Sequence, residues 1–287
     1  MRSTQTIILH IIFLSIFTAC SQDKNMQTLF EYPGYDFPYQ LAEPAKSWKL
    51  PDALVEISGL SYIDTHRLAC VQDEKGIIFI FNLNTGEIEM EIGFGDDGDY
   101  EGIEIIENDA WVLKSNGILY KVVDYLKKGD PPVIKYKTAL SGKNDTEGLA
   151  YDPVNKSLLI ACKENPFVDE KGGKKLKAIY SFKLETKLLE TEPFLLINMD
   201  TVRYYNGDVT FKPSGIAIHP ATGNIFILGS AGNLLLVLSG KGEMLAVIHL
   251  SPKIFPQPEG ICFSPDGNLY IANEGDGLQG SVLKFEP

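Results

Sequence analysis

Apolar and polar residues alternate with a period of two along most of this chain, and turn residues interrupt the alternation every few positions. Such alternation is typical of short β-strands. Five stretches open with a small or acidic residue, then glycine, then an apolar alternation, and their glycines stand at positions 59, 102, 148, 215 and 260. The intervals are 43, 46, 67 and 45 residues. Recurrence at this spacing, with several strands in each repeat, indicates the blades of a β-propeller.

Each repeat is expected to hold four strands. The predicted strands are 57–63, 67–72, 77–82 and 88–92; 102–106, 110–114, 118–123 and 133–138; 148–151, 157–162, 178–184 and 191–196; 215–218, 224–228, 234–238 and 244–250; and 260–263, 268–273 and 281–285. The fifth repeat therefore lacks one strand. Residues 47–50, with a start as early as Tyr39, are predicted to supply it, because a closed ring leaves no open sheet edge.

The interval of 67 residues raises the alternative of a six-bladed ring. A sixth blade would need an interval of about 90 residues. Two insertions, 165–177 and 198–212, account for the extra length, and the second contains the pair Tyr204-Tyr205. Loops of this length are often functional. The sequence therefore predicts an all-β chain with one five-bladed β-propeller over residues 38–287.

The N-terminus resembles a bacterial lipoprotein signal. Met1-Arg2 is followed by an apolar run from Ile7 to Phe17 and then by Thr18-Ala19-Cys20. This run is too short to span a bilayer. We expect residues 1–19 to be removed, Cys20 to be acylated and residues 20–37 to form a tether; a plain secretory signal or an N-terminal anchor is the alternative. The absence of Asp directly after Cys20 favours the outer membrane, with the periplasmic or the outer face left open.

Charge and cysteine content narrow the class of protein. The net charge is −12 and no basic cluster is present, which argues against a nucleic-acid partner. Beyond Cys20, the cysteines at 70, 162 and 262 are odd in number and stand in apolar strand patterns without metal-ligand spacing. They are predicted to be buried free thiols. The domain is expected to be a monomer that binds an unidentified protein or small molecule.

Two sets of positions are expected at one mouth of the propeller channel. The first precedes each repeated glycine and the second ends each second strand; the main members are Ser58, Glu101, Glu147, Ser214 and Glu259, and Asp73, Lys114, Lys163, Glu164, Asn273 and Glu274. Crowded carboxylates repel one another and raise one another's pKa unless a cation neutralises them. A hard cation with oxygen ligands suits such a site, and Ca²⁺ tolerates irregular geometry better than Mg²⁺.

One string, D-x-E-G, occurs twice, at Asp99–Gly102 and at Asp145–Gly148. Glu101 and Glu147 are therefore the leading metal-ligand candidates, with Asp99, Asp145 and Glu259 behind them. The acid-rich loop before Glu101 lacks the spacing of an EF-hand. As alternatives, these acids form a solvated turn, or the repeated glutamates tie adjacent inner strands together.

Nucleophilic catalysis has little support, because the chain contains no Gly-x-Ser-x-Gly motif and its four histidines have no obvious partner. The histidine at 219, beside a proline, is expected in a turn. A metal-dependent hydrolase would need an ion with an open coordination position and a base near it. Lys114, Lys163 and Arg203 are the basic residues predicted nearest the carboxylates.

The units Ile57–Leu60, Asp99–Ile103, Asp145–Asp152 and Pro258–Ile261 resemble those of the SdiA-regulated β-propeller family, over about residues 45–287. The resemblance implies an envelope-associated propeller with a Ca²⁺ site at Glu101, Glu147 and Glu259. Ser58 and Ser214 replace the acid in two units, so a fully acidic ring is not expected. Three functions follow: a calcium-binding recognition lipoprotein, a metal-dependent hydrolase or lactonase at the same mouth, or a scaffold without a ligand.

Overall fold

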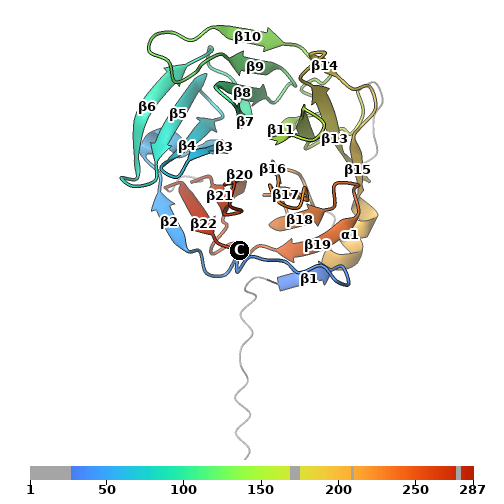
Figure 1. The fold of residues 1–287 in the computed structure, drawn as a ribbon. Coiled ribbons are helices and arrows are strands. Elements are labelled where there is room, and N and C mark those ends of the chain that lie inside the picture. The colour runs from blue at the N-terminus through green and yellow to red at the C-terminus, as the bar shows by residue number, and fades with distance from the viewer. Residues whose placement is uncertain (1–26, 169–174, 208–209, 276–278) are drawn as a thin grey trace, which may run out of the picture.

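Five small antiparallel sheets form a ring around a central channel in the computed structural model, as Figure 1 shows along the ring axis. The structure describes residues 27–168, 175–207, 210–275 and 279–287. Each sheet is one blade, so the predicted five-bladed β-propeller is confirmed, and the six-bladed alternative is wrong. No helix in the described part of the chain is long and apolar enough to cross a membrane.

The blades follow the repeats in the sequence. Blades one and two consist of β3 (Ile57–Asp64), β4 (Arg67–Gln72), β5 (Ile77–Asn82) and β6 (Glu87–Gly93), and of β7 (Tyr100–Ile106), β8 (Asp109–Lys114), β9 (Leu119–Val122) and β10 (Val133–Tyr136). Blade three has β11 (Thr146–Asp152), β12 (Ser157–Cys162), β13 (Leu176–Lys183), β14 (Leu188–Leu189) and β15 (Leu195–Asn198). In each of these blades the first strand lies nearest the channel.

Blade four consists of β16 (Gly215–Ile218), β17 (Ile225–Gly229), β18 (Leu234–Leu238) and β19 (Met244–His249). Blade five has β20 (Pro258–Phe263), β21 (Leu269–Asn273), β22 (Ser281–Phe285) and β2 (Lys46–Lys49). The strand β2 pairs antiparallel with β22, which confirms closure of the ring by an N-terminal strand. A 3₁₀ turn at Asp52–Leu54 links β2 to blade one.

Two local predictions were wrong. In place of one outer strand predicted at 191–196, the structure has two short strands, β14 before this range and β15 from Leu195, which both pair with β13. Pro193, between them, has no N–H to donate to a sheet ladder. The tether predicted at 20–37 is shorter within the described residues, because β1 (Gln27–Glu31) pairs with β19 as a fifth strand of blade four.

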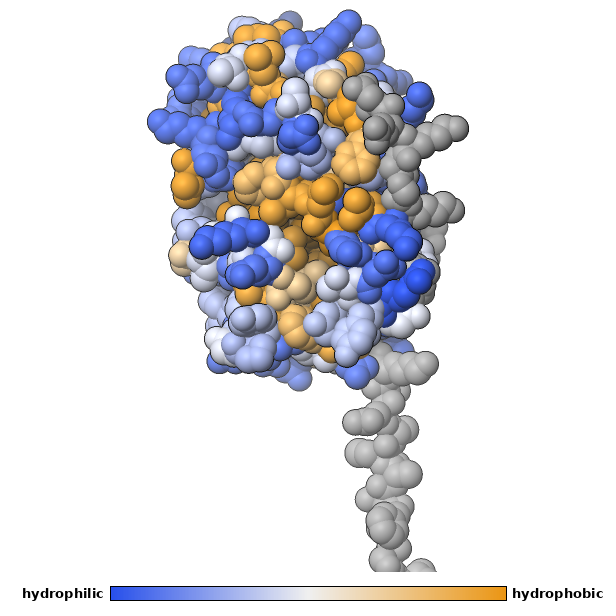
Figure 2. All heavy atoms as spheres, turned by 90° about the vertical axis from the view of Figure 1, so that its right-hand side faces the viewer, coloured by the Kyte–Doolittle hydropathy of each residue, from blue (hydrophilic) through white to orange (hydrophobic). Residues whose placement is uncertain are grey.

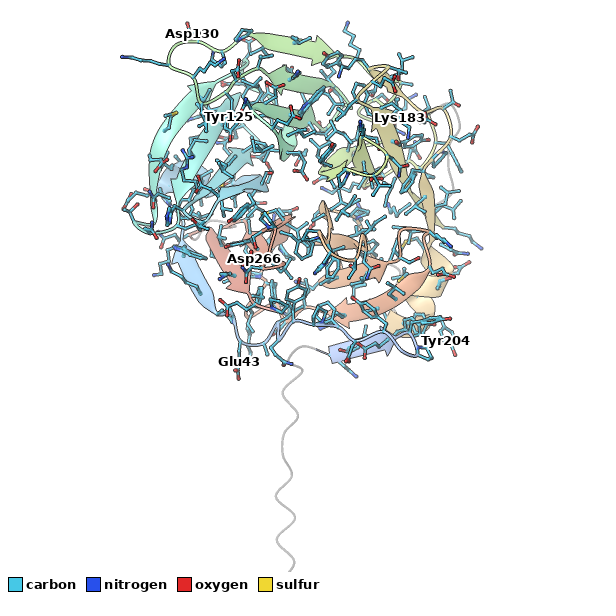
Figure 3. The ribbon with its side chains drawn as sticks, in the orientation of Figure 1. Glu43, Tyr125, Asp130, Lys183, Tyr204 and Asp266 are labelled. Carbon is cyan, nitrogen blue, oxygen red and sulfur yellow. The ribbon has the colours of Figure 1, made fainter. Side chains whose placement is uncertain are left out.

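The second predicted insertion packs against β1. Its residues form α1 (Met199–Asn206), which begins at the Asn198 cap, and the ring of Tyr205 stacks on Phe30 of β1 with centroids 4.1 Å apart. Tyr204 lies at the outer rim of the ring and is 82% exposed (Figure 3). Residues 169–174 of the first insertion lie outside the described residues.

The hydrophobic core consists of five layers, each between two neighbouring blades. Trp48 of the closing strand belongs to the layer between blades five and one, and its indole N–H donates to the carbonyl of Leu83 at 2.7 Å. Cys70, Cys162 and Cys262 are free and buried in these layers, as predicted. Closure therefore buries apolar surface at the last junction as well as pairing the last edge.

The repeated glycines lie where the inner strands come closest together. A Cβ added to Gly59 would stand 3.0 Å from the Cα of Gly102, and one added to Gly215 would stand 2.3 Å from the carbonyl oxygen of Glu259. Similar clashes occur at the other three glycines. Glycine is thus required because the backbone of the next blade occupies the space of a side chain.

We predict that Gly215→Ala lowers the free energy of unfolding by about 1–3 kcal/mol or more, because the clashing atom belongs to the backbone and cannot rotate away. Chemical denaturation of the purified protein measures this. The matched control is Gly93→Ala at the end of β6, where an added Cβ meets nothing within 4 Å. Equal stability of both variants would show that the ring of glycines tolerates side chains.

Candidate acidic mouth of the channel

The channel has two different ends, separated by a narrow passage. The five glycine units line the passage, which has a volume of only about 10 Å³. At the N-terminal ends of the inner strands, the passage opens into a cavity of about 320 Å³, here called the acidic mouth. Its lining residues are Glu56, Ser58, Asp73, Asp99, Glu101, Asp145, Glu147, Lys163, Gln257, Glu259 and Glu274.

A β-bulge presents the residue before the glycine to the mouth. In four blades the pairing of the first two strands shifts register there, for example between Tyr100 and Gly102 and between Thr146 and Gly148. A bulge leaves one residue out of the ladder and re-aims its side chain. Glu101 and Glu147 are such residues, which explains why they line the mouth.

All five predicted metal-ligand candidates line this one cavity, together with the predicted mouth residues Ser58, Asp73, Lys163 and Glu274. Sequence reasoning missed Glu56 and Gln257. Glu56 stands two residues before Ser58, and Gln257 stands two residues before Glu259. Asp99 and Asp145 stand at the same offset before Glu101 and Glu147. The same offset in each unit was the signal that could have found them.

Four predicted mouth residues lie elsewhere. Lys114 places its Nζ 5.2 Å from the centre of the Tyr100 ring, and Glu164 pairs with Lys212 at 2.5 Å. Asn273 is buried, and its side-chain amide donates to Ser281 Oγ at 3.2 Å. Ser214 lines the narrow passage instead of the mouth.

The two serines that replace acids act as ties between blades. Ser58 Oγ donates to the carbonyl of Tyr100 at 2.6 Å, and Ser214 Oγ donates to the carbonyl of Pro258 at 2.7 Å. Both bonds cross to the next blade in the ring. The role considered for the repeated glutamates, tying adjacent inner strands, is therefore performed by the serines.

Lys163 is the single basic residue among those that line the mouth. Its Nζ lies 2.7 Å from Glu147 Oε1. Burial disfavours the charged ammonium, but Glu147, Asp145 and Glu259 outweigh this effect and raise the pKa of Lys163. One fixed positive charge thus faces eight carboxyl groups supplied by four blades.

The remaining carboxyl groups are held in energetically costly surroundings. Burial, the charge of Glu147 and a hydrogen bond with Asp99 raise the pKa of Glu101 strongly. Burial and a hydrogen bond with Glu56 likewise raise the pKa of Glu274. A cation bound near Glu101 and Glu274 would favour their ionised forms.

The carboxyl groups of Glu259 and Asp73 also lie in unfavourable surroundings in the mouth. Burial raises the pKa of Glu259 to about 7. Asp73 Oδ1 is buried without a hydrogen-bond partner in the described structure. Carboxylate oxygens with the amide of Gln257 and the hydroxyl of Ser58 form a donor set that suits a hard cation. As their side chains stand, the described His, Cys, Asp and Glu residues form no ready cluster of three or more metal ligands.

Comparison with known proteins identifies the family. A model of the SdiA-regulated family matches residues 39–276, so the chain belongs to this family. The fold is similar to the PQQ-bound aldose sugar dehydrogenase of Streptomyces coelicolor, with 12% identity and a TM-score of 0.52 over 85% of this chain and 97% of that one. A gluconolactonase of Xanthomonas campestris matches with 13% identity and a TM-score of 0.50 over 77% and 69%. At such identities the likeness shows the fold alone.

We predict that, in the presence of a chelator, the melting temperature falls as the pH rises from about 5 to about 8. Acids of the mouth, among them Glu101, Glu147, Glu259 and Glu274, have raised pKa values in the folded state, so in this window the folded protein binds more protons than the unfolded one. For Glu259, whose pKa rises from 4.5 to about 7, the full effect corresponds to roughly 3 kcal/mol.

Glu259→Gln should make this fall smaller, which thermal unfolding at several pH values measures. Glu164→Gln is the control, because the ion pair with Lys212 lowers the pKa of Glu164 and the residue lies outside the mouth. A melting temperature that stays constant or rises over this range would contradict the prediction.

Proposed function

We propose that this member of the SdiA-regulated family is a cation-binding recognition module of the cell envelope, with the acidic mouth as its cation site and Ca²⁺ as the first cation to test. The observation that carries the proposal is the convergence of eight carboxyl groups and one lysine on a cavity of about 320 Å³. Glu101 and Glu147 come first as ligands, with Glu259, Asp99 and Asp145 beside them.

The electrostatic cost of the mouth supports a bound cation. Two carboxylates about 4 Å apart repel by about 4 kcal/mol at an effective dielectric constant near 20. Lys163 compensates Glu147 directly, whereas Glu101 and Glu274 have other acids, Asp99 and Glu56, as hydrogen-bond partners. A divalent ion near Glu101 would convert this repulsion into attraction after a side-chain rotation.

We predict that Ca²⁺ raises the melting temperature of the wild-type protein. A hundredfold excess over the dissociation constant stabilises the folded state by about 2.7 kcal/mol, which corresponds to roughly 5–10 °C for a domain of this size. The double variant Glu101→Gln, Glu147→Gln should lose the shift, because it removes the two leading ligands. Thermal unfolding with CaCl₂, with MgCl₂ and with chelator measures it.

Glu164→Gln serves as the matched control, since Glu164 follows Lys163 in sequence but lies outside the mouth. Its calcium shift should equal that of the wild type. No calcium shift in the wild type, together with no metal in the purified protein, would reject the cation site and favour the scaffold.

A hydrolase or lactonase at the same mouth is the second candidate. The pKa of Glu259, raised by burial to about 7, suits a general base at neutral pH. Lactone hydrolysis in the presence of Ca²⁺ tests this candidate, and Glu259→Gln should abolish any such activity. Calcium binding without lactone turnover would reject the hydrolase and favour the recognition module.

The proposed anchor lies outside the described residues, at Cys20. If Cys20 carries lipid, the seven residues from there to Gln27 of β1 hold blade four within about 25 Å of the membrane surface. The lipid chains tether the protein without a spanning helix. The proposal places the domain at the outer membrane and leaves open whether it lies on the periplasmic or the outer face.

We predict that Cys20→Ser moves the protein from the membrane fraction to the soluble fraction, because acylation is the proposed source of membrane affinity. Cell fractionation followed by immunoblotting measures the distribution. Ser21→Ala is the control and should remain with the membrane. Unchanged membrane association of Cys20→Ser would show that a different segment anchors the protein.

A further inference from the structure

A cavity larger than the acidic mouth lies at the opposite end of the channel from it. It has a volume of about 670 Å³ and is here called the distal cavity. The ends of all five inner strands contribute to it, for example Tyr62 of β3, Glu104 of β7 and Tyr151 of β11. Its size is that of a pocket for a small organic ligand.

The distal cavity extends outwards between blades three and four. Phe194, in the link between β14 and β15, and Gly240, in the turn between β18 and β19, belong to its lining. Figure 2 views these two blades from the side and shows a hollowed band of hydrophobic side chains between hydrophilic patches. A ligand in this cavity would therefore meet a largely apolar surface.

Glu104 is a carboxyl group in this apolar wall with no basic partner. Its Oε2 accepts from Ser61 Oγ at 3.1 Å and its Oε1 accepts from the backbone N–H of Tyr151 at 3.0 Å. These bonds leave acceptor capacity on both oxygens. No lysine or arginine is among the described residues that line the cavity. Burial raises the pKa of Glu104 to about 7, which reflects the missing counter-charge.

The imidazole ring of His219, which also lines the cavity, is neutral. Nδ1 of His219 accepts from the backbone N–H groups of Ala221 and Thr222 at 3.2 and 3.3 Å, so the proton of the neutral ring is on Nε2. Burial lowers the pKa of His219, which keeps the ring uncharged. Asp152, the second carboxyl group of the lining, accepts hydrogen bonds from the backbone N–H groups of Val154 and Asn155 and from the Asn155 side-chain amide. The cavity thus combines the carboxyl group of Glu104 with aromatic rings, those of Tyr62, Tyr151, Phe194 and Phe263 among them.

We infer that the distal cavity binds a small organic ammonium ion with an apolar body, and that Glu104 is the residue that selects its charge. Aromatic rings attract a cation through their faces, and a carboxylate supplies the opposite charge and a hydrogen-bond acceptor. An anionic ligand of the same shape would be repelled by Glu104 and by the acidic protein. This site is independent of the cation site proposed at the mouth.

Glu104 also differs from its counterparts in the other repeats. The residue two positions after each repeated glycine is Ser61, Ala150, Ala217 or Cys262 in the other four units, and Glu104 is the one charged residue at this position. A small residue is enough to fit the neighbouring inner strand. The carboxyl group is therefore not explained by the requirements of the propeller fold.

The test is titration of the purified protein with three probes that share one body: 2-phenylethylamine, 2-phenylethanol and 3-phenylpropanoate. Isothermal titration calorimetry at about pH 8, where Glu104 is ionised, should show saturable binding of the amine and at least tenfold weaker binding of the alcohol and the acid. Affinity for the amine should fall at about pH 6. Binding of the acid as tight as that of the amine, or no binding of the amine, would overturn the inference.

Glu104→Gln should weaken binding of 2-phenylethylamine at least tenfold while the alcohol is unaffected. The matched control is Glu101→Gln with Glu147→Gln, which removes acids from the mouth and should leave amine binding unchanged. Loss of amine binding in this control, but not in Glu104→Gln, would place the amine at the mouth and reject the distal site. If Glu104→Gln fails to fold, Ala217→Leu decides, because its larger side chain takes up space at the cavity wall and should weaken binding of the amine at least tenfold.

Discussion

The close approach of five inner strands is the constraint on which the rest of this structure depends. At Gly215 and Gly260 an added Cβ would come within 2.4 Å of an atom of the next blade. Side chains are thus excluded from the narrowest part of the channel. The pairing of the first two strands contains a bulge just before the glycine, and the side chain of the bulged residue lies in the acidic mouth. Packing at the axis and the position of the functional side chains therefore have one cause.

This geometry makes the mouth electrostatically expensive. A bulged residue on each of several blades points to a common axis, so acids at these positions meet one another. Glu147 finds a counter-charge in Lys163, which reaches into the mouth from the end of β12. For Glu101, burial first of all, then the charge of Glu147 and a hydrogen bond with Asp99, raise the pKa. The protein thus retains an arrangement that costs stability at neutral pH, as is common at functional sites.

The repeat pattern was enough to predict the architecture, because glycine spacing and strand alternation are local properties of the sequence. The same pattern, with an odd strand before the first repeat, predicted the closing strand. The bulges were not predictable, since they arise from contacts between blades. Lys114 and Lys163 end equivalent strands, yet one packs on Tyr100 and the other enters the mouth. β1 was missed because its five residues acquire strand structure only by pairing with β19 and packing under α1.

The two ends of the channel are chemically separate environments on one set of strands. β7 carries Glu101 at the mouth and Glu104 at the distal cavity, three residues apart. The passage between them, at about 10 Å³, barely reaches the space of a single water molecule. A ligand cannot pass from one end to the other while the glycines remain packed. The mouth, rich in carboxyl groups, suits a hard metal ion, whereas the distal cavity, with the carboxyl group of Glu104 among aromatic rings, suits an organic cation.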